Sequence, residues 1–126
     1  MQRTIKTYGK YFTDFYKKLH EEVQEKIEWV FELVKTADKI PKKYFDHFTN
    51  TDGLFEIRIE YESNIYRIIC FFDKGNVVVL INSFQKKSQK TPPNELKLAK
   101  ELKKQYFIDK KIDEENENRN NKKVKK

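Results

Sequence analysis

Hydrophobic residues in the first third of the chain recur at the spacing of an α-helix. Between about residues 10 and 38 they fall three or four positions apart, which places them on one helical face. They are Phe12, Phe15, Tyr16, Leu19, Val23, Ile27, Val30, Phe31 and Val34. The pattern predicts two helices, or one bent helix, with the break near His20. Pro41 ends the region, because proline disfavours helical geometry in the residue before it, and residues 2–8 fit a short opening strand.

The spacing changes between residues 54 and 84, where three short runs are rich in β-branched and aromatic residues. The sequences ESNI at 62–65 and DKGN at 73–76 separate these runs and are typical of hairpin turns, so neighbouring strands are predicted to be antiparallel. A first turn centred on Ser63 and Asn64 builds one continuous apolar face. The facing pairs are then Ile59 with Ile68, Ile57 with Cys70, and Phe55 with Phe72.

The opposite face of this sheet is predicted to carry the charged residues. Arg67 lies opposite Glu60 in the same register, and Glu56 and Arg58 point the same way. With a second turn centred on Lys74 and Gly75, the third strand adds Val77, Val79 and Ile81 to the apolar face, and Val78, Leu80, Asn82 and Phe84 to the arginine face. The sequence therefore predicts a sheet with one helix-covered side and one side that carries two arginines.

A last helix is predicted to begin near Thr91, which can cap it, followed by prolines that suit a first helical turn. Its apolar face consists of Leu96, Ala99, Leu102 and Tyr106. Residues 109–126 contain only two apolar side chains, too few to offset the entropy of ordering them, and predict a disordered charged tail. We expect one α+β domain over residues 1–108, with two N-terminal helices packed on a twisted antiparallel sheet of three to four strands and a C-terminal helix.

The net charge of +7 over 126 residues changes this picture, because it favours a polyanionic partner. Charge alone also suits an acidic protein or an anionic membrane, so it gives nucleic acid a prior of roughly one half. The single cysteine, Cys70, excludes an intramolecular disulfide and suits a reducing compartment. The amino terminus lacks the apolar core of a signal peptide, and no stretch approaches the ~20 apolar residues of a membrane span. A cytoplasmic protein without a membrane partner is expected.

Three lysines cluster between the end of the third strand and the start of the last helix, where unpaired amides and the helix dipole attract phosphate. They are Lys86, Lys87 and Lys90. An isolated lysine-rich loop is more often only solvated surface. The predicted convergence with Arg58 and Arg67 favours a phosphate site, because an unpaired charge in a middle strand is costly. No zinc-ligand spacing or glycine-rich nucleotide loop is present, so neither a metal nor another cofactor is expected.

Lone histidines and aromatic residues support weaker hypotheses. His47 could reach the arginine face, but a lone histidine in a polar loop is more often a surface residue, and His20 is expected on a helix surface. Trp29 and the run Tyr44, Phe45 and Phe48 could stack on nucleobases. Core packing is the better interpretation for most of these rings.

The chain between about residues 52 and 106 resembles the HigB-like branch of the RelE superfamily, which are toxins of type II toxin–antitoxin systems. The resemblance is carried by GLFEIRIE, IYRII and VVLINSFQKKSQKTPPNELKLAK, in that order and spacing. It implies a RelE-like fold and a metal-independent endoribonuclease that cuts messenger RNA, commonly on the ribosome. In that reaction the ribose 2′-hydroxyl attacks the adjacent phosphate and expels a 5′-hydroxyl. It also implies a cognate antitoxin, often one with a helix-turn-helix domain.

The same resemblance implies roles for individual residues. Arg67 matches a tyrosine–arginine motif and would be the main phosphate and transition-state contact. Lys87, with Lys86 beside it, would hold the phosphate or assist the leaving group. Arg58 and Glu56 occupy polar positions of the first long strand, where some relatives carry lysines, so Glu56 is either the general base or only an arginine's partner. The remaining RNA contacts are expected at Lys90, Asn82, Phe84 and Gln85.

Two further hypotheses remain open. A non-catalytic toxin on the same scaffold, similar to the ParE-like inhibitors of DNA gyrase, would bind a protein target. An inactive relative would only bind its antitoxin. Retention of Arg67 and the paired lysines favours the endoribonuclease over both.

Overall fold

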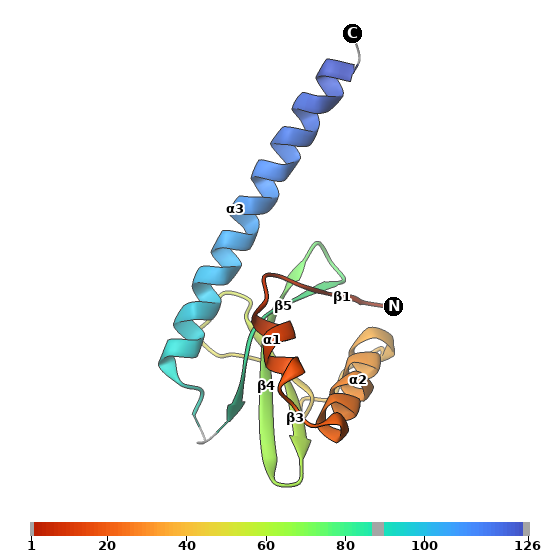
Figure 1. The fold of residues 1–126 in the computed structure, drawn as a ribbon, viewed down its shortest axis with the longest axis vertical. Helices are drawn as coiled ribbons and strands as arrows, with labels where there is room; N and C mark the ends of the chain where they lie inside the picture. Colours follow the sequence, from red (N-terminus) through yellow and green to blue (C-terminus); the bar gives the residue numbers. More distant parts are fainter. Residues whose placement is uncertain (1, 87–89, 125–126) are drawn as a thin grey trace.

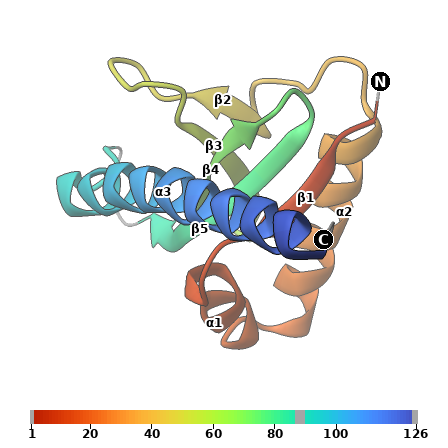
Figure 2. The same ribbon diagram turned by 90° about the horizontal axis from the view of Figure 1, so that it is seen from above.

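The structure is a computed structural model of the chain, and it describes residues 2–86 and 90–124. A five-stranded sheet forms its centre, with helices on both sides (Figures 1 and 2). In chain order the elements are β1 (Thr4–Thr7), α1 (Tyr11–Lys17), α2 (Glu21–Thr36), β2 (Phe45–His47), β3 (Phe55–Tyr61), β4 (Asn64–Asp73), β5 (Val77–Lys86) and α3 (Pro93–Val124).

The two N-terminal helices confirm the helical spacing of the first third of the chain. The chain breaks at His20, whose extended backbone (φ −60°, ψ 151°) separates α1 from α2. The apolar face of α2 is buried against the sheet and consists of Val23, Ile27, Val30, Phe31 and Val34. Burial of this stripe, rather than any side-chain cap, holds the helix in place, since no side chain caps its first turn.

The sheet differs from the predicted antiparallel sheet of three to four strands, which is wrong in strand number and in direction. The strand order is β1-β5-β4-β3-β2, and β1 pairs in parallel with β5, so the sheet is mixed. The strand that the sequence does not predict is β2, which lies in the segment predicted as a polar loop around His47. Three residues are too few to show a two-residue alternation, so pairing with β3 is what defines this strand.

The turn between β3 and β4 lies one residue earlier than the sequence predicts. Glu62 and Ser63 form the turn, and Ile57 therefore pairs with Ile68 rather than with Cys70. The register is shifted by two residues from the predicted one. Because side chains alternate with a period of two, such a shift exchanges partners but leaves every side chain on its predicted face.

This hairpin provides a stability prediction. Glu62 (φ 46°) and Ser63 (φ 66°) both adopt left-handed backbone geometry, which favours asparagine and glycine in two-residue turns. Replacing both, as Glu62→Asn with Ser63→Gly, is expected to raise the free energy of unfolding by about 1 kcal/mol. Urea denaturation would measure the gain. Glu62→Ala, which keeps the strain, should give none, and equal stabilities for the three proteins would contradict the prediction.

The hairpin between β4 and β5 changes the predicted faces of the third strand. Asp73 pairs with Val77 across a three-residue turn, so the start of β5 is one residue out of the predicted register. The first part of β5 therefore presents the opposite faces to those expected: Val78 and Leu80 face α1 and α2, and Val79 and Ile81 face α3. A β-bulge then interrupts the pairing opposite Ile69, between the pairs Cys70–Leu80 and Ile68–Ser83.

Each side of the sheet has its own hydrophobic core. The larger core lies between the sheet and the helices α1 and α2. The smaller core lies under α3, where Ala99 and Tyr106 are buried and Leu96 and Leu102 are partly buried, as their spacing predicts. The arginine side of the sheet is therefore partly covered by α3, and the pair of Arg67 and Glu56 lies near the start of this helix.

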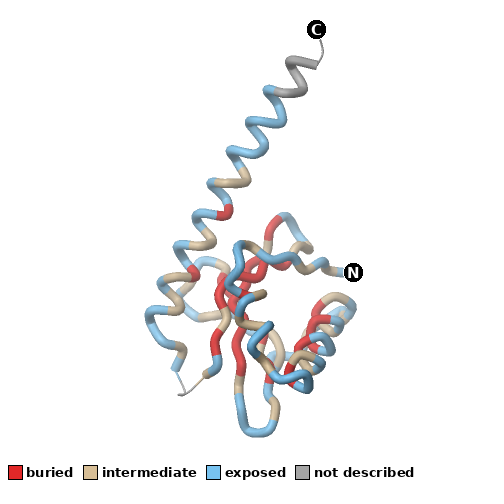
Figure 3. The backbone as a smooth tube through the Cα atoms, viewed as in Figure 1, coloured by how far each residue is buried: buried red, intermediate tan, exposed pale blue. Residues whose placement is uncertain are grey.

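The last helix extends beyond the body of the molecule (Figure 3). The sequence predicts a disordered tail from residue 109, whereas α3 continues to Val124. Asp109 and Lys110 bond to side chains of the sheet region, which holds the helix just past residue 108. Extending a helix that is already nucleated is inexpensive, so the exposed residues 111–119 follow it. Within the described parts of the chain, no helix is both long and apolar enough to cross a membrane.

Candidate functional site

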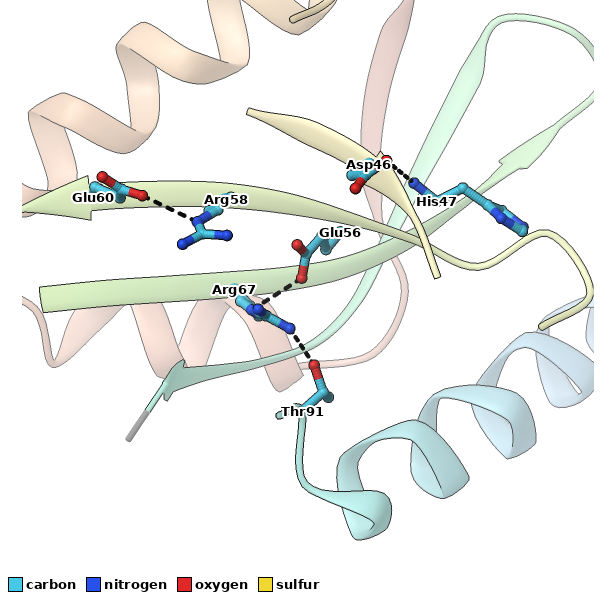
Figure 4. A network of polar contacts seen from close by, with 7 residues as sticks. All are labelled: Asp46, His47, Glu56, Arg58, Glu60, Arg67 and Thr91. Atoms are coloured by element: carbon cyan, nitrogen blue, oxygen red, sulfur yellow. Dashed lines mark hydrogen bonds and ion pairs between the residues drawn. The ribbon is translucent and has the colours of Figure 1, made fainter. Parts of the chain in front are cut away.

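A cluster of charged side chains lies on the α3 side of the sheet, where β3 and β4 run next to each other (Figure 4). Arg58 pairs directly with Arg67, and Glu56 lies two residues before Arg58 on the same face. The predicted shared face of the two arginines and the glutamate is therefore present in the structure. Their catalytic roles stay a prediction.

The centre of the cluster is a buried ion pair between Glu56 and Arg67. Arg67 Nε lies 3.0 Å from Glu56 Oε2, and the two side chains are only 8% and 10% exposed. The contact does not have hydrogen-bond geometry, and neither atom has another hydrogen-bond partner among the described residues. A buried guanidinium that is only partly compensated is costly, so an anionic ligand would improve its surroundings.

Burial and pairing act in opposite directions on this ion pair. Burial raises the pKa of Glu56, and the positive charges of Arg67, Arg58 and Lys86 partly offset that rise. Burial also lowers the pKa of Arg67, which Glu56 opposes. The pKa of Glu56 stays above its ordinary value, which makes this carboxylate a better proton acceptor than an exposed glutamate.

Arg67 also contacts the segment that leads into α3. Its Nη1 donates a hydrogen bond to the Thr91 hydroxyl, two residues before the helix begins. The sequence prediction gave Thr91 the role of a helix cap and missed this contact. Nη1 carries a second N–H group, so a phosphate that binds both terminal nitrogens of Arg67 would lie beside the Thr91 hydroxyl, next to the start of α3.

Arg58 and Lys86 lie at the margin of the buried pair. Arg58 Nε is 3.1 Å from Glu60 Oε1, and its side chain is 29% exposed. Lys86 ends β5 and is half-buried. Burial, followed by the charges of Arg67 and Arg58, lowers the pKa of Lys86. These two cations can attract a phosphate from solvent towards the deeper Arg67.

Lys86 and Lys90, two of the three predicted loop lysines, are among the described residues. Lys87, which the resemblance places at the site, lies outside the described residues. Lys90 is exposed in the segment just before α3. Lys86 is placed beside the arginines, and Lys90 directly precedes Thr91, which contacts Arg67.

Of three other predicted RNA contacts, only Phe84 adjoins the cluster, because it pairs directly with Arg67 across the sheet. Asn82 is buried, and its amide donates to the main-chain oxygen and to Oε1 of Glu95 at 2.9 Å each, which ties β5 to α3. Phe84 packs in the core under α3. Gln85 pairs with a β4 residue on the α1–α2 side of the sheet and donates to Asn64 at 3.0 Å. Structural contacts occupy all three side chains.

The strand β2 brings an unexpected acidic residue to the site and leads His47 away from it. Asp46 pairs with Glu56 in the register and adds to the rise in its pKa. The ring of His47 packs against Phe55 on the other face, 5.0 Å between centroids (Figure 4). Among the described residues, no group of three or more His, Cys, Asp or Glu side chains is placed to hold a metal ion.

The fold and the site together define a small basic α+β protein with a buried carboxylate–arginine pair beside the start of its last helix. Residues 14–104 match the family model described as phage derived protein Gp49-like (DUF891), and the chain belongs to this family. The family comprises RelE-like toxins of toxin–antitoxin systems, which confirms the expected resemblance at this level. No curated protein matches the chain.

Proposed function

We propose that the chain is the toxin of a type II toxin–antitoxin system, of the HigB-like branch, and that it cleaves messenger RNA without a metal ion. The observation that carries the proposal is the buried pair of Glu56 and Arg67, flanked by Arg58 and Lys86. Cleavage of RNA by its own 2′-hydroxyl needs a proton acceptor, a proton donor and positive charge around the phosphate. The cluster contains a candidate for each requirement.

Positive charge is the role of Arg67. Its planar guanidinium can bind two phosphate oxygens at once and can stabilise the additional charge of the pentavalent transition state. Arg58 and Lys86 guide the phosphate inward from the margin. The lowered pKa of Lys86 makes its ammonium a stronger acid, suited to giving a proton to the departing 5′-oxygen. Lys87 keeps the role that the family resemblance implies.

Glu56 has two possible roles, and both stay open. As a general base it would take the proton of the 2′-hydroxyl, which its raised pKa favours. As a positioning residue it would only hold Arg67 Nε, to which it is already paired at 3.0 Å. The dependence of the cleavage rate on pH separates the two roles. If the rate rises as a group with a raised pKa loses its proton, and Glu56→Gln abolishes this pH dependence, Glu56 is the general base.

The partners follow from the same proposal. Messenger RNA, held by the ribosome, is the substrate, and a small antitoxin with a helix-turn-helix domain is the cognate inhibitor. The net charge of +7 supports a polyanionic substrate. Because Thr91 contacts Arg67, a partner that fixes the start of α3 would keep phosphate from the guanidinium.

The first test is induction of the chain in cells that lack the antitoxin. Growth arrest is expected, together with transcripts cut to 2′,3′-cyclic phosphate and 5′-hydroxyl ends. Sequencing of RNA ends that selects each chemistry would map the cuts. Normal growth with intact transcripts would overturn the proposal, and arrest with intact transcripts would favour the non-catalytic, ParE-like alternative. Co-expression with the cognate antitoxin should restore growth.

A further inference from the structure

An exposed patch of aromatic and basic side chains lies at the edge of the sheet beside Arg58. This aromatic patch consists of Lys26 and Trp29 from α2, and Lys43 and Tyr44 from the segment before β2. Trp29 is 51% exposed, although it belongs to the helix whose apolar stripe from Val23 to Val34 is buried in the core. A large ring left half in water beside a second aromatic residue is typical of a contact surface.

The geometry of the patch combines rings with cations. Lys26 Nζ lies 4.5 Å from the centre of the Trp29 ring and 6.0 Å from that of Tyr44. Lys43 Nζ lies 5.0 Å from the centre of the Tyr44 ring, and the two rings are 5.5 Å apart at 69°. Ammonium groups beside aromatic faces provide both of the contacts that single-stranded nucleic acids use, phosphate pairing and base stacking.

The aromatic patch is continuous with the candidate site. The main-chain N–H of Arg58 donates a hydrogen bond to the carbonyl oxygen of Tyr44 at 2.8 Å. Tyr44 directly precedes β2, so it extends the pairing with β3 by one hydrogen bond. A cavity of about 160 Å³ joins the two regions and is lined by Lys26, Lys43, Tyr44, Arg58 and Glu60. Glu60 is the one carboxylate in that lining, and Arg58 pairs with it.

We propose that the aromatic patch is a subsite for an unpaired base of the RNA strand that passes through the candidate site, with Trp29 as the stacking surface. The inference rests on the proposed function, because it assigns a subsite to the same RNA. Three cations against one carboxylate around the cavity complement a phosphate backbone. An unpaired base can reach the exposed ring of Trp29, whereas the bases of a duplex are stacked inside it and would leave the ring in water.

Binding of a single-stranded RNA that cannot be cut provides the test. Fluorescence anisotropy would follow a labelled oligoribonucleotide whose 2′-hydroxyls are methylated, titrated with the full chain. Trp29→Ala is expected to weaken binding about tenfold, as loss of a stacking ring does. The matched control is Tyr11→Ala, which removes another exposed ring, 44% exposed, from α1 and should leave binding unchanged. An abasic oligomer should bind the wild-type chain and Trp29→Ala equally.

A second variant tests the charged half of the patch. Lys43→Ala should reduce the slope of log Kd against log salt by about 0.7, the value for one phosphate contact on a single strand. Circular dichroism would confirm the fold of each variant, and Trp29→Phe should retain most of the affinity.

Several results would overturn the inference. One is equal binding by wild type and a folded Trp29→Ala, and another is an equal loss in Tyr11→Ala. If Trp29→Ala binds RNA normally but no longer binds the antitoxin, the aromatic patch is a contact surface for a protein partner instead. The wild-type chain could also leave transcripts intact in cells while Trp29→Ala still loses RNA binding. The intact transcripts would refute the proposed cleavage, and the lost binding would support the subsite. Binding and cleavage are measured separately, so the two failures are distinguishable.

Discussion

Arg67→Ala is expected to reduce RNA cleavage by about 10²- to 10³-fold, the usual loss when one donor to a developing oxyanion is removed. Arg67 is the most deeply buried cation of the cluster, and its side chain is only 8% exposed. Its interaction with phosphate oxygens is therefore little weakened by water. Cleavage of a defined messenger RNA by the purified chain on ribosomes would measure the loss.

Controls must separate catalysis from folding, because Arg67→Ala leaves the buried carboxylate of Glu56 without its partner. The double variant Glu56→Gln with Arg67→Gln removes both charges and should fold while remaining inactive. Arg67→Lys retains the charge but not the planar fork, and should recover only part of the rate. Arg119→Ala, on the exposed outer part of α3, should cleave like wild type. Full cleavage by a folded double variant would exclude Arg67 and Glu56 from the chemistry.

Helices α1 and α2 and the first part of α3 could be predicted from the sequence because their apolar residues recur at helical spacing. The stripe on α2 extends over about three turns, from Val23 to Val34, and a polar residue at one position does not obscure it. The two edge strands give a weaker local signal in the sequence, since β1 has four residues and β2 has three. β1 is defined by its pairing with the distant β5, and β2 by its pairing with β3 across a loop, and local alternation reveals neither pairing.

The face that carries the arginines was predicted correctly, although the predicted registers of the strands are wrong. Between β3 and β4 the register is wrong by two residues, which keeps Arg58 and Arg67 on one face. Between β4 and β5 it is wrong by one, which reverses the faces of Val79 and Ile81. The bulge then adds one residue and restores the predicted face at Phe84, so two unpredicted features cancel.

The parts of the site that the sequence did not predict all depend on non-local contacts. Thr91 meets Arg67 only because α3 folds back over the sheet, and Asp46 reaches Glu56 only through β2. The sequence names Trp29 only as a weaker stacking hypothesis, although its position off the apolar stripe of α2 indicates a ring outside the core. Residue types therefore indicated the chemistry, while tertiary pairing determined which of them meet.

The position of α3 depends on a buried polar cluster at the far end of β4. Asp73 accepts a hydrogen bond from the Tyr106 hydroxyl at 2.6 Å and from Lys110 Nζ at 2.7 and 2.9 Å. The Tyr8 hydroxyl donates to Asp109 at 2.5 Å one turn along the same helix face. These contacts join α3 to β1 and β4, and the same helix brings Thr91 against the arginines at its other end.

Asp73→Ala is expected to lower the free energy of unfolding by about 2–3 kcal/mol, because it leaves the Tyr106 hydroxyl and Lys110 without their buried acceptor. Hydrogen exchange should accelerate along α3 between residues 96 and 110 more than in α2. Asp113→Ala removes an exposed carboxylate from the same helix and should change neither quantity. Unchanged exchange in α3 of Asp73→Ala would show that apolar packing alone holds the helix.

The stabilisation by Asp73 should also depend on pH in a defined direction. Burial by itself raises the pKa of Asp73, but the hydrogen bonds from Lys110 and Tyr106 outweigh it, so the folded pKa lies below the ordinary 3.8. The unfolded chain therefore takes up this proton at a higher pH than the folded chain. The difference in stability between wild type and Asp73→Ala should be complete above about pH 4 and shrink as the pH falls through the folded pKa. Urea denaturation of both proteins between pH 7 and pH 3 measures this difference in stability. A difference that stays constant down to pH 3 would mean that the charge of the Asp73 carboxylate does not hold α3.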